Sequence, residues 1–508
     1  MNKIYQTPLL PLLAAALLPI NAHAEWGTPE EPHALMTVDD NVVASMKTAR
    51  TPDGKTFISW LSYGDRPDWG YELRLQLLDA DGNPMWEPDG IQVEDVRNCS
   101  WTADYWMVVS PEGDAIISWA DARDQEDMPN PISHVSVVYK VSQDQEMLWG
   151  DRGIELGEQY KYPATLYQFG DDTYCLMQSA ENWGTPQITR LSSDGTFEFE
   201  PKDFFGNLIQ SEGTDFISVY SNSEGTVAMR YTRDIEPVWD TPAVLSTYIY
   251  NGYGREPYCM VSDGNGGAVV SFSRELGGFS HLPVVAYVTA DGEAVFGESA
   301  DVIATEKNDH NYAKIGVNTE TETIMATWQM SSGIYALGGQ LMDYYGERMW
   351  GDDGKLLAEK DSPSGYSYGP IAVYPLEDDK WFVVYADELW WANNQLNYSV
   401  YDSEGNLLSN RQGIESTGVD DYSTYMEGKD FYMFFLNEYT DDDWVDHSAI
   451  MVVKITDFST GMKEINSDNI TTGQTEYYNL SGMRIPAPAP GLNIVRNADG
   501  TTHKLIMK

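Results

Sequence analysis

The sequence predicts an all-β protein: a β-propeller of seven or eight four-stranded blades followed by a small C-terminal β module. Three observations predict this fold. A turn followed by an aromatic residue recurs along the chain, apolar runs of strand length precede these turns, and the body of the chain lacks the 3.6-residue periodicity of helices.

Residues 1–24 predict a cleavable signal peptide. Lys3 supplies an early positive charge, an apolar run extends from Leu9 to Ile20, and the small-residue site Ala22-His23-Ala24 follows. This run is too short to anchor a protein in a membrane, and no later stretch of the sequence approaches the required length. We therefore expect a protein without a transmembrane segment that is extracellular, or on the outer cell surface, after cleavage near Ala24.

The composition is acidic and aromatic. The 508 residues include 79 Asp and Glu against 31 Lys and Arg, a formal net charge of −48. Because phosphate binding needs a basic surface, nucleic acid is excluded as a partner. The chain also has 16 Trp, 32 Tyr and 15 Phe, far more than a disordered chain contains. Its three cysteines, Cys99, Cys175 and Cys259, are an odd number, so we expect small buried side chains rather than a disulfide framework.

Seven segments share a Gly-containing turn followed four positions later by a residue that we call the anchor. The anchors are Trp86, Trp149, Phe199, Trp239, Phe296, Trp350 and, with the aromatic lost, Ser409. Two segments have Gln145 and Ile235 in place of the Gly. The interval between anchors runs from 40 residues, Phe199 to Trp239, to 63, Trp86 to Trp149. A period near 50 is typical of propeller blades, solenoid turns or arrays.

Each repeat also contains strands with distinct patterns. A tight Asp- and Gly-rich turn precedes a continuous apolar run, such as the run ending at Trp119, as expected for a strand covered on both faces. A strand of alternating residues follows, for example Leu73, Leu75 and Leu77. Four antiparallel strands per unit indicate a propeller blade.

Counting a final hairpin at residues 431–456 gives eight units, of which the fourth is short. Either eight blades close with one reduced, or units three and four merge and seven close; we favour eight. A pair of β-sandwiches would fit the strand lengths but not the recurring spacing from Gly to Trp. We expect Trp86, Trp149, Trp239 and Trp350 to be buried at blade interfaces.

The Gly-x-x-x-Trp turn resembles the repeat of quinoprotein-like propellers, in which the Trp docks one blade on the next. The resemblance implies this docking role and no bound quinone, because the preceding Asp, as in Asp79 before Gly82, is displaced by one position from the family pattern.

The end of the chain resembles the C-terminal sorting domain of Bacteroidetes type IX secretion (Por) cargo. The matching residues are Tyr478, Leu480, Gly482, Gly491, Leu492, Ile494, Val495, Gly500 and Lys508, while Asn493 replaces the usual Tyr. The resemblance implies that secretion machinery is a partner. We expect a propeller over residues 25–458, a linker over 459–475 and this sorting-type module over 476–508.

The connections between the apolar and the alternating strands are longer than the turns, and they should emerge together on one face. Loops on a rigid scaffold commonly carry binding groups. An exposed Trp beside carboxylates suits a sugar ring or a cationic group, although each Trp would alternatively cover its own blade. The candidate ligand-binding residues in these loops are Trp69, Trp183, Trp390, Trp391, Trp444, Asp68 and Glu388.

Metal and catalytic sites are less evident in the sequence. Asp441, Asp443 and His447 are candidate metal ligands, and Ca²⁺ is the ion that such oxygen ligands would take, although in so acidic a chain such clusters are more often solvated turns. No other cofactor is evident. We identify no catalytic residues, because the sequence contains no Gly-x-Ser-x-Gly and no His-Glu-x-x-His motif.

The sequence therefore favours a secreted or cell-surface binding or adhesion propeller whose ligand is a glycan, a peptide or a protein. The alternative is a glycan-active enzyme with carboxylates at the centre of the same face.

Overall fold

The computed structural model describes most of the chain from Trp26 onward. The described residues are 26–39, 43–62, 71–93, 104–123, 134–178, 185–247, 259–277, 280–297, 301–302, 310–330, 335–359, 368–387, 395–409, 412–414, 422–440, 446–456, 458, 476–478, 484–485, 491–496 and 502–507. Over these residues the structure has no α-helix, and hence none long and apolar enough to cross a membrane. The chain divides into two compact units, residues 1–458 and 459–508.

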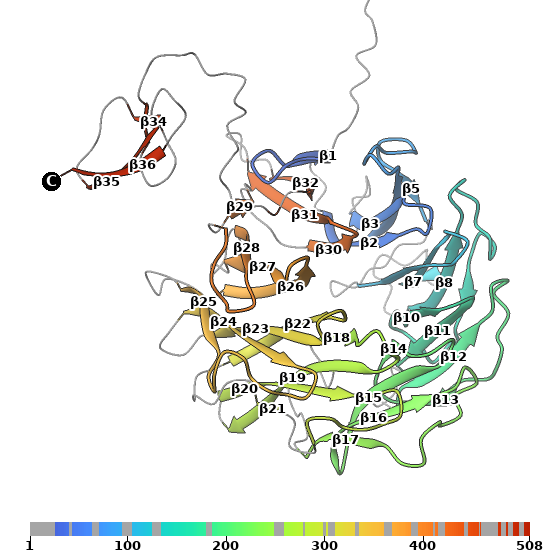
Figure 1. Cartoon of the computed structure of the whole chain (residues 1–508). Coiled ribbons are helices and arrows are strands. Elements are labelled where there is room, and N and C mark those ends of the chain that lie inside the picture. The colour runs from blue at the N-terminus through green and yellow to red at the C-terminus, as the bar shows by residue number, and fades with distance from the viewer. Residues whose placement is uncertain are drawn as a thin grey trace, which may run out of the picture. The chain divides into compact units, whose positions relative to one another are not determined.

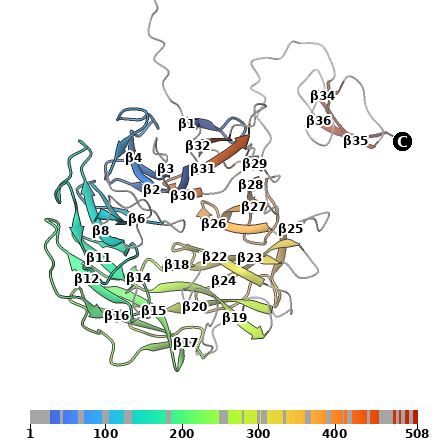
Figure 2. The same ribbon diagram turned by 180° about the vertical axis from the view of Figure 1, so that it is seen from behind.

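The first unit is a ring of eight four-stranded antiparallel sheets, which confirms the propeller with eight blades (Figures 1 and 2). The strands of blades 1 and 2 are β2 (Val43–Arg50), β3 (Thr56–Ser62), β4 (Glu72–Leu78), β5 (Ile91–Gln92), β6 (Trp106–Val109), β7 (Ala115–Asp121), β8 (Val135–Val141) and β9 (Ile154–Glu155). Those of blades 3 and 4 are β10 (Thr165–Phe169), β11 (Asp172–Met177), β12 (Gln187–Leu191), β13 (Lys202–Asp203), β14 (Asn207–Gln210), β15 (Phe216–Asn222), β16 (Gly225–Tyr231) and β17 (Ala243–Ser246). Those of blades 5 and 6 are β18 (Cys259–Ser262), β19 (Ala268–Gly277), β20 (Ser280–Val288), β21 (Asp301–Val302), β22 (His310–Asn318), β23 (Thr323–Met330), β24 (Ala336–Asp343) and β25 (Lys355–Glu359). Blade 7 contains β26 (Tyr368–Leu376), β27 (Lys380–Asp387), β28 (Gln395–Tyr401) and β29 (Gln412–Ile414).

Blade 8 joins the two ends of this unit. Its strands β30 (Tyr422–Glu427), β31 (Asp430–Thr440) and β32 (Asp446–Ile455) are completed by β1 (His33–Asp39), which pairs with β32. The first strands of blades 8 and 1 are also linked, because the Thr48 and Ser423 hydroxyls lie 2.6 Å apart. The ring is therefore closed by hydrogen bonds between segments some 400 residues apart.

The first strand of each blade lies innermost, so that β2, β6, β10, β14, β18, β22, β26 and β30 surround the axis, with contacts between neighbours. Because the strands are antiparallel, alternate connections emerge on opposite faces. We call the two faces the tight-turn face, with the connections from first to second and third to fourth strand, and the long-loop face, with the others. Blade 4 explains the short fourth repeat, because only Ser223 and Glu224 separate its second and third strands.

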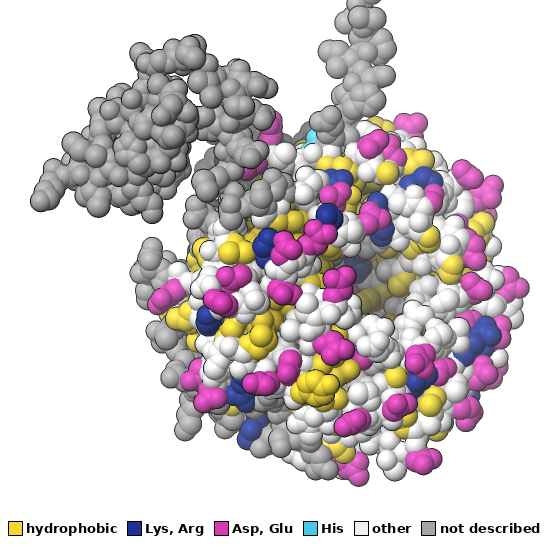
Figure 3. All heavy atoms as spheres, viewed as in Figure 1, with side chains coloured by type: hydrophobic (Ala, Val, Ile, Leu, Met, Phe, Trp, Pro, Cys, Tyr) yellow, Lys and Arg dark blue, Asp and Glu magenta, His cyan; other side chains and the backbone are white. Residues whose placement is uncertain are grey.

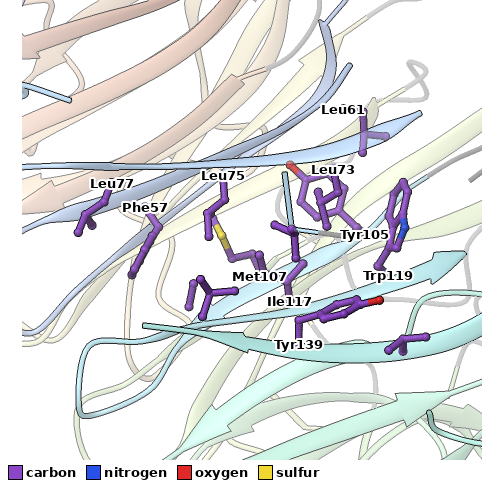
Figure 4. Packing of buried hydrophobic residues seen from close by; sticks show 14 of the residues in the cluster. Phe57, Leu61, Leu73, Leu75, Leu77, Tyr105, Met107, Ile117, Trp119 and Tyr139 are labelled. Atoms are coloured by element: carbon purple, nitrogen blue, oxygen red, sulfur yellow. The ribbon is translucent and has the colours of Figure 1, made fainter. Parts of the chain in front are cut away.

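The core lies between the blades. Strands β3 and β7 are buried along their whole length, as expected for continuous apolar runs. Between blades 1 and 2, Phe57 and Leu75 from one sheet face Met107, Ile117 and other residues of the next, as Figure 4 shows. The largest fully buried side chains include Trp60, Trp119, Trp328 and Trp381, all on second strands.

The four tryptophan anchors dock on the following blade. Each indole Nε1 donates a hydrogen bond to a carbonyl oxygen in the next third-to-fourth turn: Trp86 to Gln143 (3.1 Å), Trp149 to Ser193 (3.2 Å), Trp239 to Ala290 (3.0 Å) and Trp350 to Ser403 (2.8 Å). The turn glycine fits beneath the ring, since a Cβ on Gly292 would lie 2.8 Å from Trp239. The predicted interface position is confirmed. The predicted burial is right for Trp350, at 8 % exposure, and wrong for the other three, which are half-buried because they cap the core at the tight-turn face.

Blade 8 also explains why Ser409 replaces an aromatic anchor. Its third and fourth strands come from opposite ends of the unit, so the described residues of blade 8 contain no third-to-fourth turn like those on which the tryptophan anchors dock. The anchor of blade 8 itself is Trp26, which the sequence analysis missed. Its Nε1 donates to Ala80 at 3.1 Å, and its ring lies over Gly82.

The second unit contains a four-stranded antiparallel sheet in the order β34-β33-β35-β36. Its strands are β33 (Glu476–Tyr478), β34 (Arg484–Ile485), β35 (Gly491–Arg496) and β36 (Thr502–Met507).

Candidate functional site

Nearly all of the residues predicted to bind ligand or metal lie outside the described residues. These are Asp68 and Trp69 between β3 and β4, Trp183 between β11 and β12, Glu388, Trp390 and Trp391 between β27 and β28, and Asp441, Asp443 and Trp444 between β31 and β32. His447 lies in β32, paired with Asp39 and Tyr439, but its side chain is not described. Their roles stay predictions, and all of these connections open on the long-loop face.

The described part of the long-loop face presents four exposed aromatic side chains. Trp106 and Tyr422 are each 40 % exposed, Tyr162 is 47 % and Phe205 is 49 % exposed. Trp106 and Tyr422 begin the innermost strands β6 and β30, and Tyr162 and Phe205 shortly precede the innermost strands β10 and β14. All four therefore lie where the chain turns from a blade edge toward the axis, on blades 8, 2, 3 and 4.

Trp106 lies within a small charged group. Lys47, on the innermost strand of blade 1, forms an ion pair with Asp104 at 3.1 Å, and its ammonium lies 5.6 Å from the centre of the Trp106 ring. The Asp104 carboxylate is more than half exposed. A flat apolar surface thus stands beside an accessible carboxylate and an ammonium, the combination that binds the faces and hydroxyl groups of a sugar.

Buried hydroxyl groups hold the aromatic positions. Ser59 and the Tyr105 hydroxyl lie 2.8 Å apart, directly before Trp106. The Ser118 hydroxyl accepts from the Ala164 backbone N–H at 2.7 Å, two residues after Tyr162, and Ser218 donates to the Phe205 carbonyl at 2.6 Å. Because these three serines are fully buried, they fix the backbone from which the exposed rings project.

Phe205 contacts another aromatic side chain on the same face. Its ring is stacked on Tyr220 of β15, with centroids 6.5 Å apart and planes at 30°. Since blade 4 connects β15 and β16 by a two-residue turn, this pair lies beside the short connection. The stack extends the apolar surface on blade 4.

The polar residues at the long-loop end of β7 stabilise the scaffold. Arg123 donates to Asp121 through Nε (2.9 Å) and Nη2 (2.7 Å), and Tyr139 donates to the same carboxylate at 3.1 Å. Asp121 and Arg123 are buried, so this pair does not face a ligand. Nearby, burial lowers the pKa of His134 and a Coulombic interaction with Asp121 opposes that shift.

One acidic turn on the opposite face is saturated with hydrogen bonds. The Asp263 carboxylate accepts from the backbone N–H groups of Asn265 and Gly267, both at 2.7 Å, and from the Tyr287 hydroxyl at 2.9 Å. This carboxylate caps its turn. Within the described ranges, no group of three or more His, Cys, Asp and Glu side chains is arranged to hold a metal ion.

Figure 3 shows a ring hollowed at its centre, with acidic side chains spread widely and hydrophobic side chains gathered in separate patches. Asp104 and Trp106 could have been found from the sequence. They stand together in Asp104-Tyr105-Trp106, but binding groups were expected only in the loops between second and third strands. The connections that lead into the next blade open on the same face, so they supply binding groups equally well.

The sequence matches no known family model, and no curated protein matches it either. Solved structures with a similar fold include a protein of unknown function from Dyadobacter fermentans (10 % identity, 83 % of this chain and 99 % of that chain, TM-score 0.36). Another is the β-propeller domain of the Trilobed protease from Pyrococcus furiosus (11 % identity, 74 % of this chain and 98 % of that chain, TM-score 0.38). A third is the polysaccharide lyase Uly1 (10 % identity, 87 % of this chain and 94 % of that chain, TM-score 0.41). At these identities and scores the likeness concerns the fold alone.

Proposed function

We propose that the protein is a secreted or cell-surface binding propeller that recognises a glycan through its long-loop face. The observation that carries this proposal is Trp106, 40 % exposed beside the Lys47–Asp104 ion pair at the start of an innermost strand. An exposed indole next to directed polar groups favours a ligand with a flat apolar face and hydroxyl groups. A peptide or protein ligand is the other outcome of the test.

The arrangement around Trp106 supports binding because it is rigid before a ligand arrives. Tyr105 is fully buried and hydrogen-bonded to Ser59, and Lys47 lies 5.1 Å from the centre of the Tyr105 ring. A side chain held in place by its neighbours loses little conformational entropy when it binds. The predicted loop tryptophans, Trp69, Trp183, Trp390, Trp391 and Trp444, would add contacts on the same face.

The experiment compares two exposed aromatic residues on opposite faces. Trp106→Ala and the control Tyr345→Ala, which removes an 80 % exposed ring from the tight-turn face, are tested by affinity electrophoresis against soluble glucans, mannans, xylans and chitin oligosaccharides. We expect Trp106→Ala to weaken retardation by the bound polysaccharide and Tyr345→Ala to leave it unchanged. Equal binding by both variants would refute the site, and retardation by none of the polysaccharides would refute the glycan as ligand.

The same polysaccharides distinguish binding from catalysis. Incubation with the wild-type protein should release no reducing sugar if the long-loop face only binds. Release of reducing sugar that is lower with Trp106→Ala would instead establish the glycan-active enzyme as the function.

The Trp390→Ala, Trp391→Ala double variant should weaken binding with little loss of stability, since exposed substitutions usually change the free energy of unfolding by about 0.5 kcal/mol or less.

We propose further that residues 1–24 direct export and that residues 476–508 engage the type IX secretion machinery. The C-terminal sheet belongs to a compact unit separate from the propeller, which supports independent roles. Deleting residues 476–508 should change where the protein is found in the producing cells and leave its melting temperature unchanged. A large fall in melting temperature would show that this segment completes the propeller.

A further inference from the structure

The innermost strands of blades 5 to 8 line a partly open cavity of about 300 Å³ beside the axis of the ring. It is lined by residues of β18, β22, β26 and β30. Val261, Val317 and Pro375 lie near the ends of their strands that lead into the tight turns. The cavity is therefore displaced toward the tight-turn face, away from Trp106 and the other aromatic residues of the long-loop face.

Most of the lining is aliphatic. Val261, Ile315, Ile371 and Val373 supply branched apolar side chains. Close packing of the strands forms one wall, because a Cβ on Gly316 would lie 2.6 Å from the Val373 carbonyl oxygen. The volume is at the lower end of the range of small-molecule sites, about 300–1,000 Å³, and such sites have mainly apolar walls with few polar groups.

The polar groups of the lining differ in what they offer a ligand. The Tyr374 and Thr424 hydroxyls lie 3.1 Å apart and bond to each other. Cys259 contacts the Ile315 carbonyl through its sulfur at 3.9 Å, and burial raises the pKa of its thiol, so it stays an uncharged, weakly polar group. Lys314 is the one charged residue among the described residues of the lining.

We propose that this cavity is a second binding site, for a small ligand with an apolar body and an anionic group that pairs with Lys314. Apolar walls favour the body because burying it removes apolar surface from water. The ammonium favours an anionic end, since a charge-assisted hydrogen bond in a partly enclosed site is stronger than one in water. The acidic net charge of the protein opposes this little, because solvent-exposed charges beyond about 8 Å are screened at physiological ionic strength.

Two dyes that differ by one anionic group test the proposal. 1-Anilinonaphthalene-8-sulfonate carries a sulfonate, and N-phenyl-1-naphthylamine is the same molecule without it. We expect saturable fluorescence enhancement with both dyes. Lys314→Met should weaken sulfonate binding by about tenfold, the equivalent of one charge-assisted contact, and leave the neutral dye unaffected. The control Lys429→Met removes an exposed lysine, paired with Glu377 outside the lining, and should change neither affinity.

A variant that fills the cavity locates the binding. Ala372→Phe places a ring among the lining residues and should reduce the affinity for both dyes. The proposal is overturned if a folded Ala372→Phe variant binds both dyes as the wild type does, or if Lys314→Met leaves the sulfonate affinity unchanged.

Cys259 gives a readout that needs no variant. Saturating sulfonate dye should slow its alkylation by N-ethylmaleimide, followed by mass spectrometry, whereas the fully buried Cys175 should react little with or without dye. Alkylation of Cys259 at the same rate in the presence of bound dye would contradict the proposal.

Discussion

The two faces of the propeller are built on opposite principles. On the tight-turn face, the same contacts recur from blade to blade. A carboxylate or hydroxyl caps the third-to-fourth turns of blades 1 to 7, as Asp79 and Asp402 do. A tryptophan anchor bonds to the turn of the next blade in five blades. On the long-loop face, the connections range from two residues between β15 and β16 of blade 4 to thirteen residues between β7 and β8 of blade 2. The repeated contacts hold the blades together, and the varied connections carry the groups that differ between blades.

The charged residues also differ between the two faces. On blades 2, 3 and 4 a cation, Lys140, Arg190 or Arg230, reaches a carbonyl in the turn of the following blade. Lys140 and Trp149 share the Ser193 carbonyl, and Arg230 and Trp239 share the Ala290 carbonyl. On the long-loop face, by contrast, Lys47 lies over the exposed ring of Trp106. These three cations of the tight-turn face are therefore committed to blade docking.

Among the variants that test this difference between the faces, Trp350→Ala should lower the stability most. Its side chain is 8 % exposed, packs over Gly405 and donates to Ser403, so its loss leaves a cavity at the interface of blades 6 and 7. We expect a loss of about 3–5 kcal/mol in the free energy of unfolding, measured by urea denaturation of the propeller. Trp106→Ala, on the other face, serves as control with a loss of about 1 kcal/mol or less. Similar losses for the two variants would mean that both faces hold the blades together.

Trp26→Ala should have the next largest effect. The ring lies 5.0 Å from Tyr432 and 5.7 Å from Phe434 in edge contacts, and its Nε1 bonds to Ala80 of blade 1. Because Trp26 is half-buried, we expect a loss of about 2 kcal/mol, read from the same denaturation curves. Trp149→Ala, with the matching contact to Ser193, should lose a similar amount. A negligible loss for Trp26→Ala alone would show that the ring closes through β1 without this anchor.

The fold could be predicted because its signals are local. The four-residue spacing from Gly82 to Trp86 and the apolar run ending at Trp119 each lie within one repeat, and both recur often enough to reveal the blades. Closure of the ring could not be predicted from such spacing, since β1 pairs with β32 from the other end of the unit. Trp26 still carried a signal, because Trp26-Gly27 repeats the Trp149-Gly150 and Trp350-Gly351 pairs.

The binding groups were harder to predict because exposure depends on three-dimensional position. The local sequence around Trp106 does not report its exposure, and only the start of β6 places it on an innermost strand with its ring exposed. The central cavity depends on four strands spread over residues 259–427, and no local pattern reports their approach.

In two turns, Gln145 and Ile235 take the position that Gly holds in the other repeats. Replacing such a residue with Gly should change the stability less than the tryptophan variants do, and in the opposite direction. Gln145 has φ of 69° and Ile235 has φ of 67°, a left-handed conformation that costs a side-chain-bearing residue roughly 1–2 kcal/mol. Gln145 is exposed, so Gln145→Gly should stabilise the protein by about 0.5–1 kcal/mol after the entropy cost of glycine. Ile235→Gly should stabilise less or destabilise, because Ile235 packs against the cluster of Phe204 and Phe216. Thermal unfolding of both variants checks this, and destabilisation by Gln145→Gly would refute the strain.

The smallest expected effect is a difference in pH dependence that originates on the long-loop face. Burial lowers the pKa of His134 below its ordinary value of 6.5, with Asp121 opposing and Lys161 adding to that shift. The unfolded chain therefore binds a proton at a higher pH than the folded chain does, so stability should fall as the pH decreases below 6.5. His134→Gln cannot titrate and should lose this component. The melting temperatures of wild type and variant are measured from pH 8 to pH 5. The two curves should run parallel above pH 6.5 and converge or cross below it. The effects of the many carboxylates shared by both proteins cancel in the difference between the curves. A constant difference over the whole range would mean that His134 titrates alike in the folded and unfolded chains.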